Sequence, residues 1–207
     1  MNVHSLSIVP LLSYMSVKRE KLLDAANILL AEKGYHGFSM KELAQKAEIA
    51  VGTTYLYFKD KKDLIQSLHQ RNLHTLAESM FDGFDATSSI YEQYSCIWRN
   101  FWKYSVNHPD AILAKSQFDH LPSIVQLSEE LLAKELFKEV GIMLHEGVEK
   151  EIFKPLPIDI LATLSIEICA NLARKHILGL ITVEGKLLDE MILACWNSIA
   201  LKPESTK

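Results

Sequence analysis

Apolar residues recur at helical spacing along most of this chain. In residues 18–33 they gather on one face, and Gly34 then stands where a helix ends in a left-handed conformation. Ser39 follows with Glu42 three residues later, which is the capping-box pattern that opens a helix. The sequence therefore predicts a helix over residues 18–33 and a shorter one after Ser39. The apolar positions of the first helix are Leu22, Leu23, Ala26, Leu29 and Leu30.

A tight turn joins this short helix to the next predicted element. The three residues "EIA" separate it from a third helix, predicted from Val51 to about Phe58, and Asp60 is placed to cap a fourth helix. Two short helices joined by a tight turn, the first of them braced by a longer helix, form a helix-turn-helix. The N-terminal third of the chain is therefore predicted to adopt this motif.

The remainder of the chain is also predicted to be helical. One wide apolar face runs from Ile90 to Tyr104, and Pro109 suits the first turn of the helix that follows. No stretch alternates with the period of a strand over a useful length, so the predicted fold class is all-α. The last two helices are unusually apolar, which predicts that they are covered on more than one side, as a partner subunit would do. Further helices are predicted from about Pro122 to Gly147, from Ile158 to Leu178 and from Gly185 to Leu201.

Composition places the chain among globular proteins. It has 207 residues, of which 48% are hydrophobic and 23% charged. Its three cysteines are far apart and odd in number, which argues against a disulfide framework and favours a reducing cytoplasm. No apolar run reaches the ~18 to 20 residues that cross a bilayer. We therefore expect a cytoplasmic protein.

Charge is distributed unevenly between the two parts of the chain. The net charge is -4, but residues 18–62 hold nine Lys and Arg against six Asp and Glu, and the remainder holds 13 against 20. A basic N-terminal third joined to an acidic remainder is the asymmetry expected when one part meets phosphate and the other does not. The excess of positive charge in residues 18–62 is small, so it supports the helix-turn-helix prediction but would not by itself indicate DNA binding.

The sequence contains no recognisable catalytic constellation. The eight histidines include no His-x-x-x-His pair, and there is no Cys-x-x-Cys pair, phosphate loop or Gly-x-Ser-x-Gly turn. An enzyme would need a converging set of acid, base or nucleophilic groups, and none can be named here. We therefore expect no catalytic residue, no metal site and no cofactor.

The helix-turn-helix assigns roles to the residues of the third predicted helix. Its second short helix enters the major groove of DNA, with N-terminal residues at base edges and flanking groups at phosphates. Gly52 would permit close backbone approach, the neighbouring threonines offer hydroxyl and methyl groups, and the tyrosines are long enough to reach phosphates. Without the motif, the bland interpretation is a packed tyrosine surface and a solvated lysine face. The expected contacts are Val51, Gly52, Thr53, Thr54, Tyr55, Tyr57, Lys59 and Lys61.

The run from Lys18 to Ile65 resembles the DNA-binding domain of the TetR family of bacterial transcriptional regulators. The most specific parts are "EKGYHGFSMKELAQKA" and "GTTYLYFKDKKDL". The resemblance implies an all-helical homodimer that represses transcription from a palindromic operator and usually lets go when a small molecule binds the C-terminal domain. On the matching positions it implies DNA contacts at Gly52, Thr53, Tyr55, Tyr57 and Lys61. It also implies that the DNA backbone lies beside Ser39, Met40 and Lys41.

Two positions depart from the family pattern. Glu48 stands in the turn where glycine is common, so it must accept the backbone that the turn requires, a strained one included. Ala50 stands where serine often caps the third helix, and losing that cap costs about 1 kcal/mol. We expect a somewhat less stable DNA-binding domain.

Four parts follow from these observations. Residues 1–16 are predicted to be a disordered or apolar tail, although Met15 is an equally good start codon, and residues 203–207 are a second tail. Residues 17–62 form the helix-turn-helix DNA-binding domain, and residues 63–202 form a helical effector-binding and dimerisation domain. The helix that begins at Lys61 joins the two domains, so we expect it to carry any effector-induced movement.

Aromatic residues of the C-terminal domain could line a pocket for an apolar or aromatic effector. The residues that we expect to line it are Trp98, Trp102, Phe118 and Met143. The alternative is that these residues simply form an aromatic core. A polar stripe at Thr163, Glu167, Asn171 and Arg174 faces solvent, a pocket or the seam of a dimer.

Dimerisation is predicted through the last two helices, which can pack against their copies as a four-helix bundle. A twofold dimer matches a palindrome whose half-sites lie ~10 bp or a multiple apart. The leading hypothesis is a ligand-responsive repressor with a DNA operator, a second copy and a small molecule as its partners, and no membrane partner. The alternative is an architectural DNA-binding protein of the same fold that has no effector.

Overall fold

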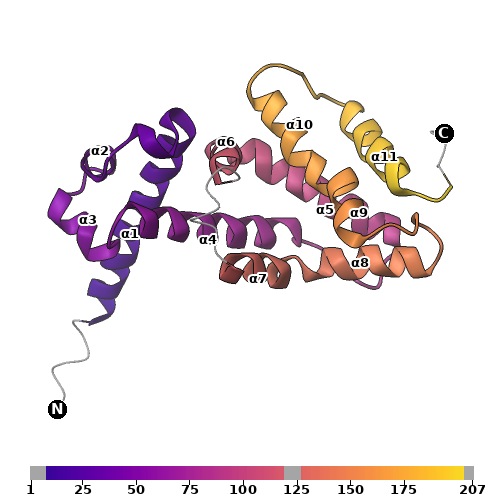
Figure 1. Ribbon diagram of the computed structural model, residues 1–207, viewed down its shortest axis with the longest axis horizontal. Helices are drawn as coiled ribbons and strands as arrows, with labels where there is room; N and C mark the ends of the chain where they lie inside the picture. Colours follow the sequence, from indigo (N-terminus) through magenta and orange to yellow (C-terminus); the bar gives the residue numbers. More distant parts are fainter. Residues whose placement is uncertain (1–7, 119–126, 203–207) are drawn as a thin grey trace, which may run out of the picture. The chain divides into compact units, whose positions relative to one another are not determined.

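The chain folds into helices that divide into two compact units. The computed structural model describes the backbone of residues 8–118 and 127–202 (Figure 1). The first unit comprises Met1–Asn72 and Leu113–Gln126, and the second comprises Leu73–Ile112 and Leu127–Lys207. The predicted all-α fold class is confirmed. Within the described ranges, no helix is both long and apolar enough to cross a membrane.

The first unit contains the predicted helix-turn-helix. Its helices are α1 (Ile8–Lys33), α2 (Met40–Lys46), α3 (Val51–Tyr57) and the start of α4 (Lys61–Met80), with a 3₁₀ turn at Tyr35–Gly37 between α1 and α2. Gly34 has φ 70° and ends α1 as predicted. The unit extends to Asn72 and takes in residues 113–126, whereas the sequence placed the boundary at residue 62.

Helix α1 begins earlier than the sequence predicted. Its backbone is helical from Ile8, although residues 1–16 were expected to form a disordered or apolar tail. Adding a residue to an existing helix is much easier than nucleating one, so the helix over residues 18–33 can extend backward through a stretch without glycine. Pro10 lies in the first turn, where its missing N–H breaks no helical hydrogen bond.

The core of the first unit is built around α1. The five apolar positions predicted on this helix, Leu22, Leu23, Ala26, Leu29 and Leu30, are all buried. They pack in one cluster with Phe38, Leu43, Phe58 and Leu64 from the elements that follow. Ala114 and Phe118 from the end of α6 (Pro109–Phe118) belong to the same cluster.

The turn between α2 and α3 holds a residue with positive φ. Glu48 has φ 56°, the left-handed conformation that glycine adopts most easily. Its N–H donates to Gln45 O at 3.2 Å, and the Ile49 N–H donates to Ala44 O at 2.9 Å, which closes the end of α2. The strained backbone that the sequence suggested at Glu48 is therefore present.

Replacing Glu48 by glycine should stabilise the protein. A left-handed conformation costs an L residue about 1–2 kcal/mol, and the greater freedom of glycine in the unfolded chain offsets part of the gain. We expect Glu48→Gly to raise the free energy of unfolding by about 1 kcal/mol in urea titrations. Gln45→Gly, at an exposed position inside α2, is the matched control and should lower it by a similar amount. Equal losses in both variants would contradict this account.

The second unit contains the end of α4, all of α5, the start of α6 and the helices from α7 onward. Phe137 interrupts the single helix predicted from Pro122 to Gly147, because it leaves helical geometry (φ −107°, ψ 21°) to pack against the core, and residues 119–126 lie outside the described part. Phe153 and Ala200 form an isolated antiparallel bridge. The remaining elements are α5 (Ile90–Asn107), α7 (Leu127–Leu136), α8 (Lys138–Glu149), α9 (Ile158–Ala162), α10 (Ile168–Ile177) and α11 (Leu187–Ile199).

A π-helical turn joins α9 to α10. The sequence predicted one regular helix from Ile158 to Leu178, but residues Thr163–Glu167 form a π turn. Such a turn carries an extra residue and disturbs the regular hydrogen bonds. Trp98 Nε1 donates to Ser165 O at 2.9 Å, and the Tyr94 hydroxyl donates to the same oxygen at 3.4 Å. Two side chains of α5 thereby satisfy a buried carbonyl of the irregular turn.

Apolar side chains remain exposed on the helices near the C-terminus. Ile160, Leu164 and Ile168 recur every four residues along α9, the π turn and α10, and each is at least 36% exposed in the single chain. The polar stripe Thr163, Glu167, Asn171 and Arg174 is exposed as well. Thr163 Oγ1 donates to Glu167 Oε2 at 3.0 Å within it. These helices therefore present a mixed apolar and polar face that the single chain leaves uncovered.

Candidate DNA interface

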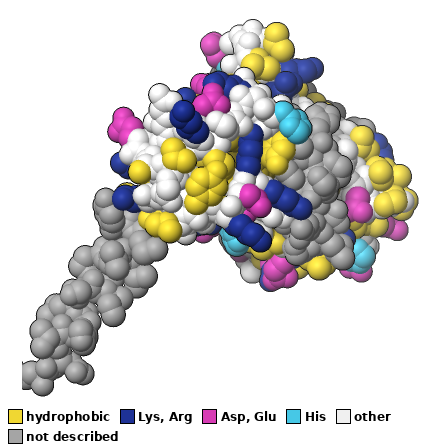
Figure 2. All heavy atoms as spheres, turned by 60° about the vertical axis from the view of Figure 1, so that its left-hand side comes forward, with side chains coloured by type: hydrophobic (Ala, Val, Ile, Leu, Met, Phe, Trp, Pro, Cys, Tyr) yellow, Lys and Arg dark blue, Asp and Glu magenta, His cyan; other side chains and the backbone are white. Residues whose placement is uncertain are grey.

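Helix α3 presents an exposed face made of apolar and aromatic residues. Tyr55 is 52% exposed and Leu56 78% exposed, and Val51 and Gly52 lie one turn earlier on the same face. A side-chain carbon built at Gly52 would meet nothing within 4 Å. The view of this side of the molecule shows hydrophobic side chains beside several Lys and Arg side chains (Figure 2). This face has the chemistry of a DNA-binding surface, with groups for base edges beside cations for phosphates.

The two ends of α3 differ in their capping. Ala50 is the N-cap and supplies no side-chain hydrogen bond, as its side chain predicted. Phe58 is buried and ends the helix, and its N–H donates to Thr54 O at 3.1 Å. Asp60 then caps α4 as predicted, because its Oδ1 accepts the Asp63 N–H at 2.9 Å. The Lys59 N–H donates to Asp63 Oδ2 at 2.8 Å, so the link between α3 and α4 follows a defined path.

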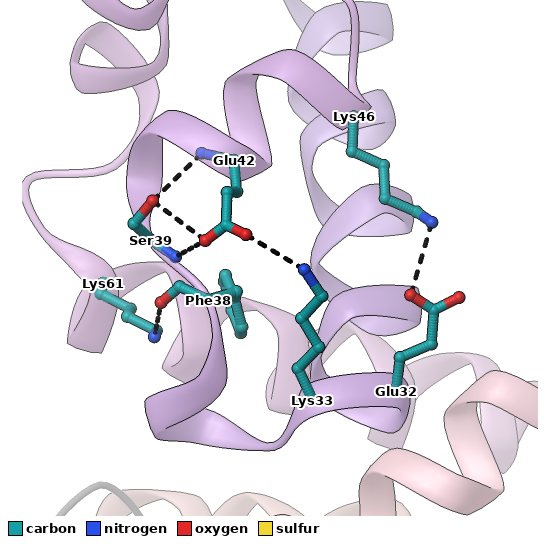
Figure 3. Close-up of polar contacts among 7 residues, drawn as sticks. All are labelled: Glu32, Lys33, Phe38, Ser39, Glu42, Lys46 and Lys61. Atoms are coloured by element: carbon teal, nitrogen blue, oxygen red, sulfur yellow. Dashed lines mark hydrogen bonds and ion pairs between the residues drawn. The ribbon is translucent and has the colours of Figure 1, made fainter.

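The predicted capping box opens α2. Ser39 Oγ accepts the Glu42 N–H at 3.2 Å, and Glu42 Oε2 accepts the Ser39 N–H at 2.9 Å (Figure 3). Lys33 Nζ lies 3.0 Å from Glu42 Oε1 and ties α2 to the end of α1. The hydrogen bond from Lys33 is the largest influence that lowers the pKa of Glu42, followed by those from Ser39. The Ser39 hydroxyl is thus engaged in capping the helix beside the proposed interface.

Several of the predicted DNA contacts lie at the surface around α3. Val51, Gly52 and Tyr55 are exposed on α3, and Lys41 and Lys59 are exposed on either side of it. Thr53 and Tyr57 are partly buried, and Tyr57 packs against the core of the first unit. The DNA contacts of all these residues, exposed and partly buried, stay predictions.

The structure contradicts the assignment of two side chains to the interface. Thr54 is fully buried and Met40 is 8% exposed. Met40 lies on the face of α2 that also buries Leu43 and Ala44, and it joins the core of the first unit. At the end of α3, Phe58 is buried and Tyr57 packs against the core of the first unit, and the same side of the helix turns Thr54 inward. Neither side chain is exposed on the face that α3 presents.

The Thr54 hydroxyl is buried without a partner. Among the described residues, its Oγ1 accepts and donates no hydrogen bond. An unsatisfied buried polar group costs about 1–3 kcal/mol, and valine has nearly the same shape without the hydroxyl. We expect Thr54→Val to raise the free energy of unfolding by about 1 kcal/mol and to leave DNA affinity unchanged. Chemical denaturation and a DNA titration measure the two effects. A loss of affinity with unchanged stability would restore Thr54 to the interface.

Lys61 is engaged within the protein. Its ammonium donates to the backbone carbonyls of Tyr35 and Phe38, and the side chain is partly buried. The sequence placed this lysine at the edge of the DNA groove. The structure turns its charged end toward the link between α1 and α2.

Leu56 is the surface residue that the sequence analysis missed. It is the most exposed large hydrophobic residue among those described, and it lies four residues after Gly52, one helical turn along α3. The helical spacing from Gly52 was the signal that could have identified it. An exposed leucine here can meet a thymine methyl group in the major groove.

The four residues predicted to line an effector pocket fall into two different cores. Trp98, Trp102 and Met143 are buried together in the core of the second unit. Phe118 belongs to the core of the first unit, where its ring centroid lies 4.6 Å from that of His69. Phe118 was therefore wrongly grouped with the other three, because α6 runs from the second unit into the first.

A surface hollow lies elsewhere in the second unit. It has a volume of about 790 Å³ and is lined by residues of α8, its C-cap Lys150 and Ile158. None of the four predicted pocket residues lines it. Two contacts link its polar side chains: His145 Nε2 lies 3.4 Å from Glu149 Oε1, and Lys150 pairs with Glu146. The effector-binding role of Trp98, Trp102 and Met143 stays a prediction.

Comparison with known proteins matches both units to family models. Residues 22–68 match the model described as bacterial regulatory proteins, tetR family. Residues 89–200 match the model described as Tetracyclin repressor-like, C-terminal domain. The two matches together cover the helix-turn-helix and most of the second unit.

Individual relatives extend over most of the chain. A TetR-family transcriptional regulator of known structure from Vibrio parahaemolyticus is 32% identical, with a TM-score of 0.75, over 88% of this chain and 98% of that one. The fatty acid metabolism regulator protein of Bacillus subtilis is 29% identical over 65% of this chain and 72% of its own. The structure of FadR from Bacillus subtilis in complex with stearoyl-CoA shares the fold, with 20% identity and a TM-score of 0.68 over 87% and 98%. The chain belongs to the TetR family of transcriptional regulators and carries the family's DNA-binding helix-turn-helix.

Proposed function

We propose that this protein is a homodimeric repressor that reads a palindromic operator through α3 and releases it when an apolar effector binds. The observation that carries the proposal is the exposed face of α3, where Tyr55 and Leu56 stand uncovered on the second helix of a helix-turn-helix. The second helix of a helix-turn-helix enters the major groove, so apolar and aromatic side chains exposed on it are placed to contact base edges.

Two kinds of contact would hold the operator. Leu56 offers an apolar group to thymine methyls, and Gly52 lets the α3 backbone approach the bases. Tyr55 has the reach for a phosphate or a base edge, and the exposed Lys41 and Lys59 supply phosphate contacts. The apolar and aromatic contacts would set sequence preference, and the lysines would make affinity depend on salt.

The uncovered helices near the C-terminus fit a second copy of the chain. Ile160, Leu164 and Ile168 form an apolar row, and Leu187 on α11 is exposed as well. Packing of these faces about a twofold axis would bury the row in a four-helix bundle. The polar stripe beside the row then lies at the rim or seam of the bundle, where it can select one register.

The effector that we propose carries a long acyl chain. Support for this class comes from Bacillus subtilis, where one relative is named as a fatty acid metabolism regulator and the structure of FadR contains stearoyl-CoA. An acyl chain also agrees with the apolar and aromatic character of the second unit. The effector acts by binding better to the dimer whose two α3 helices are wrongly spaced for the operator. Helix α4 is the proposed lever, because it begins in the first unit and ends in the second.

One observation favours the architectural alternative. Trp98 and Met143 are almost completely buried, so the side chains expected to bound a pocket contribute to a packed core. A protein of this kind would bind DNA and recruit or organise other proteins without responding to a small molecule.

Operator release distinguishes the two functions. Purified protein bound to its selected duplex is titrated with stearoyl-CoA, with coenzyme A alone and with stearate as separate controls. The repressor proposal predicts that the thioester releases the duplex and raises the melting temperature of the protein. Unchanged affinity and unchanged melting temperature with a panel of acyl-CoA chain lengths would favour the architectural role. Sedimentation without DNA tests the dimer, and a monomer at micromolar concentration would contradict it.

A further inference from the structure

The ammonium of Lys61 lies in a small site formed by the link between α1 and α2. Its Nζ donates to the carbonyl oxygens of Tyr35 and Phe38, and Figure 3 shows the bond to Phe38. The same nitrogen lies 3.8 Å from the centroid of the Phe38 ring and 4.9 Å from that of Tyr35. Two carbonyls and two aromatic faces therefore hold one cation. A lysine that only binds a DNA phosphate would not require these contacts within the protein.

The two carbonyls belong to the segment that leads into α2. Tyr35 opens the 3₁₀ turn, and Phe38 ends it directly before Ser39, the N-cap of α2. Carbonyls that are partly withdrawn from water need donors, and here a side chain from the first residue of α4 supplies them. Burial lowers the pKa of Lys61, and the nearby charge of Glu42 acts in the opposite direction.

Lys61 joins the start of α4 to the segment before α2, and α3 lies between these two points in the chain. Lys33–Glu42 and Lys46–Glu32 pair α2 with α1 at 3.0 and 3.7 Å. On the other side of α3, the Asp60 and Asp63 caps define the link to α4. When Lys61 holds the start of α4 against the start of α2, the orientation of α3 relative to α2 is determined.

We propose that Lys61 is a positioning residue for DNA recognition, which holds α3 at the angle needed in the major groove and does not neutralise a phosphate. The inference rests on the proposed DNA-binding function. It assigns to Lys61 a different role from that of Lys59, which lies two residues away and has an exposed side chain.

The salt dependence of operator binding separates the two roles. A lysine that contacts phosphate adds about one unit per protomer to the slope of log Kd against log salt, and its removal lowers that slope. Lys61→Met keeps the unbranched stem and removes the donors. We expect it to weaken binding about tenfold at every salt concentration with the slope unchanged. Lys59→Met is the matched control and should lower the slope. A fall in slope for Lys61→Met equal to that for Lys59→Met would overturn the proposal.

Lys61→Arg tests the same point with the charge retained. A guanidinium can still contact a phosphate, but its planar fork does not fit between two carbonyls above the Phe38 ring. The proposal predicts that Lys61→Arg weakens binding nearly as much as Lys61→Met, and parental affinity of the arginine variant would contradict it.

Hydrogen exchange without DNA gives an independent reading. Lys61→Met should raise amide exchange in residues 35–43, and Lys59→Met should not. If the parent protein selects no operator, the proposed function fails. Faster exchange in Lys61→Met would still show that Lys61 holds the segment before α2 in place, and unchanged exchange would refute this positioning role.

Discussion

Gly52→Glu is expected to weaken operator binding by about a hundredfold or more while the protein folds at least as well as its parent. Gly52 lies in the first turn of α3, on the face that carries Tyr55 and Leu56. A carboxylate here would point toward the phosphates and base edges of the bound operator. Like charges brought together at an interface cost several kcal/mol, and a dimer carries the change twice.

The isolated protein should tolerate this change without loss. The position has open space, since a side-chain carbon at Gly52 meets nothing within 4 Å. Glycine inside a helix costs about 0.5–1 kcal/mol relative to alanine, and an acidic group in the first turn interacts favourably with the helix dipole. Urea denaturation should therefore give an equal or higher free energy of unfolding, while a DNA titration shows the loss of affinity.

Gly141→Glu is the matched control for this prediction. Gly141 lies in α8 of the second unit, and a side-chain carbon there also meets nothing within 4 Å. The same change in charge and volume should leave operator affinity at the parental value. Parental affinity in Gly52→Glu, or equal losses in both variants, would show that α3 is not the reading element.

Trp98→Ala is expected to lower the free energy of unfolding by about 3–5 kcal/mol. Trp98 is fully buried, its ring stacks with that of Trp102 at a centroid distance of 6.2 Å, and its Nε1 donates to Ser165 O. Alanine would leave a large cavity. It would also remove the N–H group that donates to Ser165 O in the π turn. Circular dichroism in urea at fixed protein concentration measures the change without relying on tryptophan fluorescence.

Two conservative variants separate packing from hydrogen bonding. Trp98→Phe keeps an aromatic ring but removes Nε1–H, and the loss of a buried hydrogen bond costs about 1–3 kcal/mol. Tyr94→Phe removes the longer bond to the same carbonyl, 3.4 Å against 2.9 Å, and should cost less. If Trp98 instead lined an effector pocket, Trp98→Ala would preserve stability and weaken effector binding, and that result would contradict the core assignment.

Local signals in the sequence predicted the helix-turn-helix well. The Ser39–Glu42 capping box, the Asp60 cap and the left-handed Gly34 all depend on residues within a few positions of one another. The apolar face of α1 could be predicted for the same reason, because helical periodicity alone identifies it. These features determine where each helix begins and which face it buries.

The orientation of side chains on short helices could not be predicted in the same way. Helix α3 has only seven residues, and its rotation depends on core contacts with distant segments. Thr54 is therefore inside and Leu56 outside, the reverse of what its polar and apolar pattern suggests. The contacts of Lys61 within the protein could not be predicted for a related reason, since its carbonyl partners lie 26 and 23 residues away in sequence. Phe118 lies in the first core because α6 crosses between units, which no local pattern reveals.

Selection from random duplex DNA by the purified protein, followed by sequencing of the bound pool, tests the central claim most directly. The account predicts enrichment of a palindrome whose half-sites lie ~10 bp or a multiple apart, and loss of that enrichment with Gly52→Glu. Binding that enriches no sequence and falls steadily with salt would contradict it, because the protein would then hold DNA by its phosphates without reading the bases.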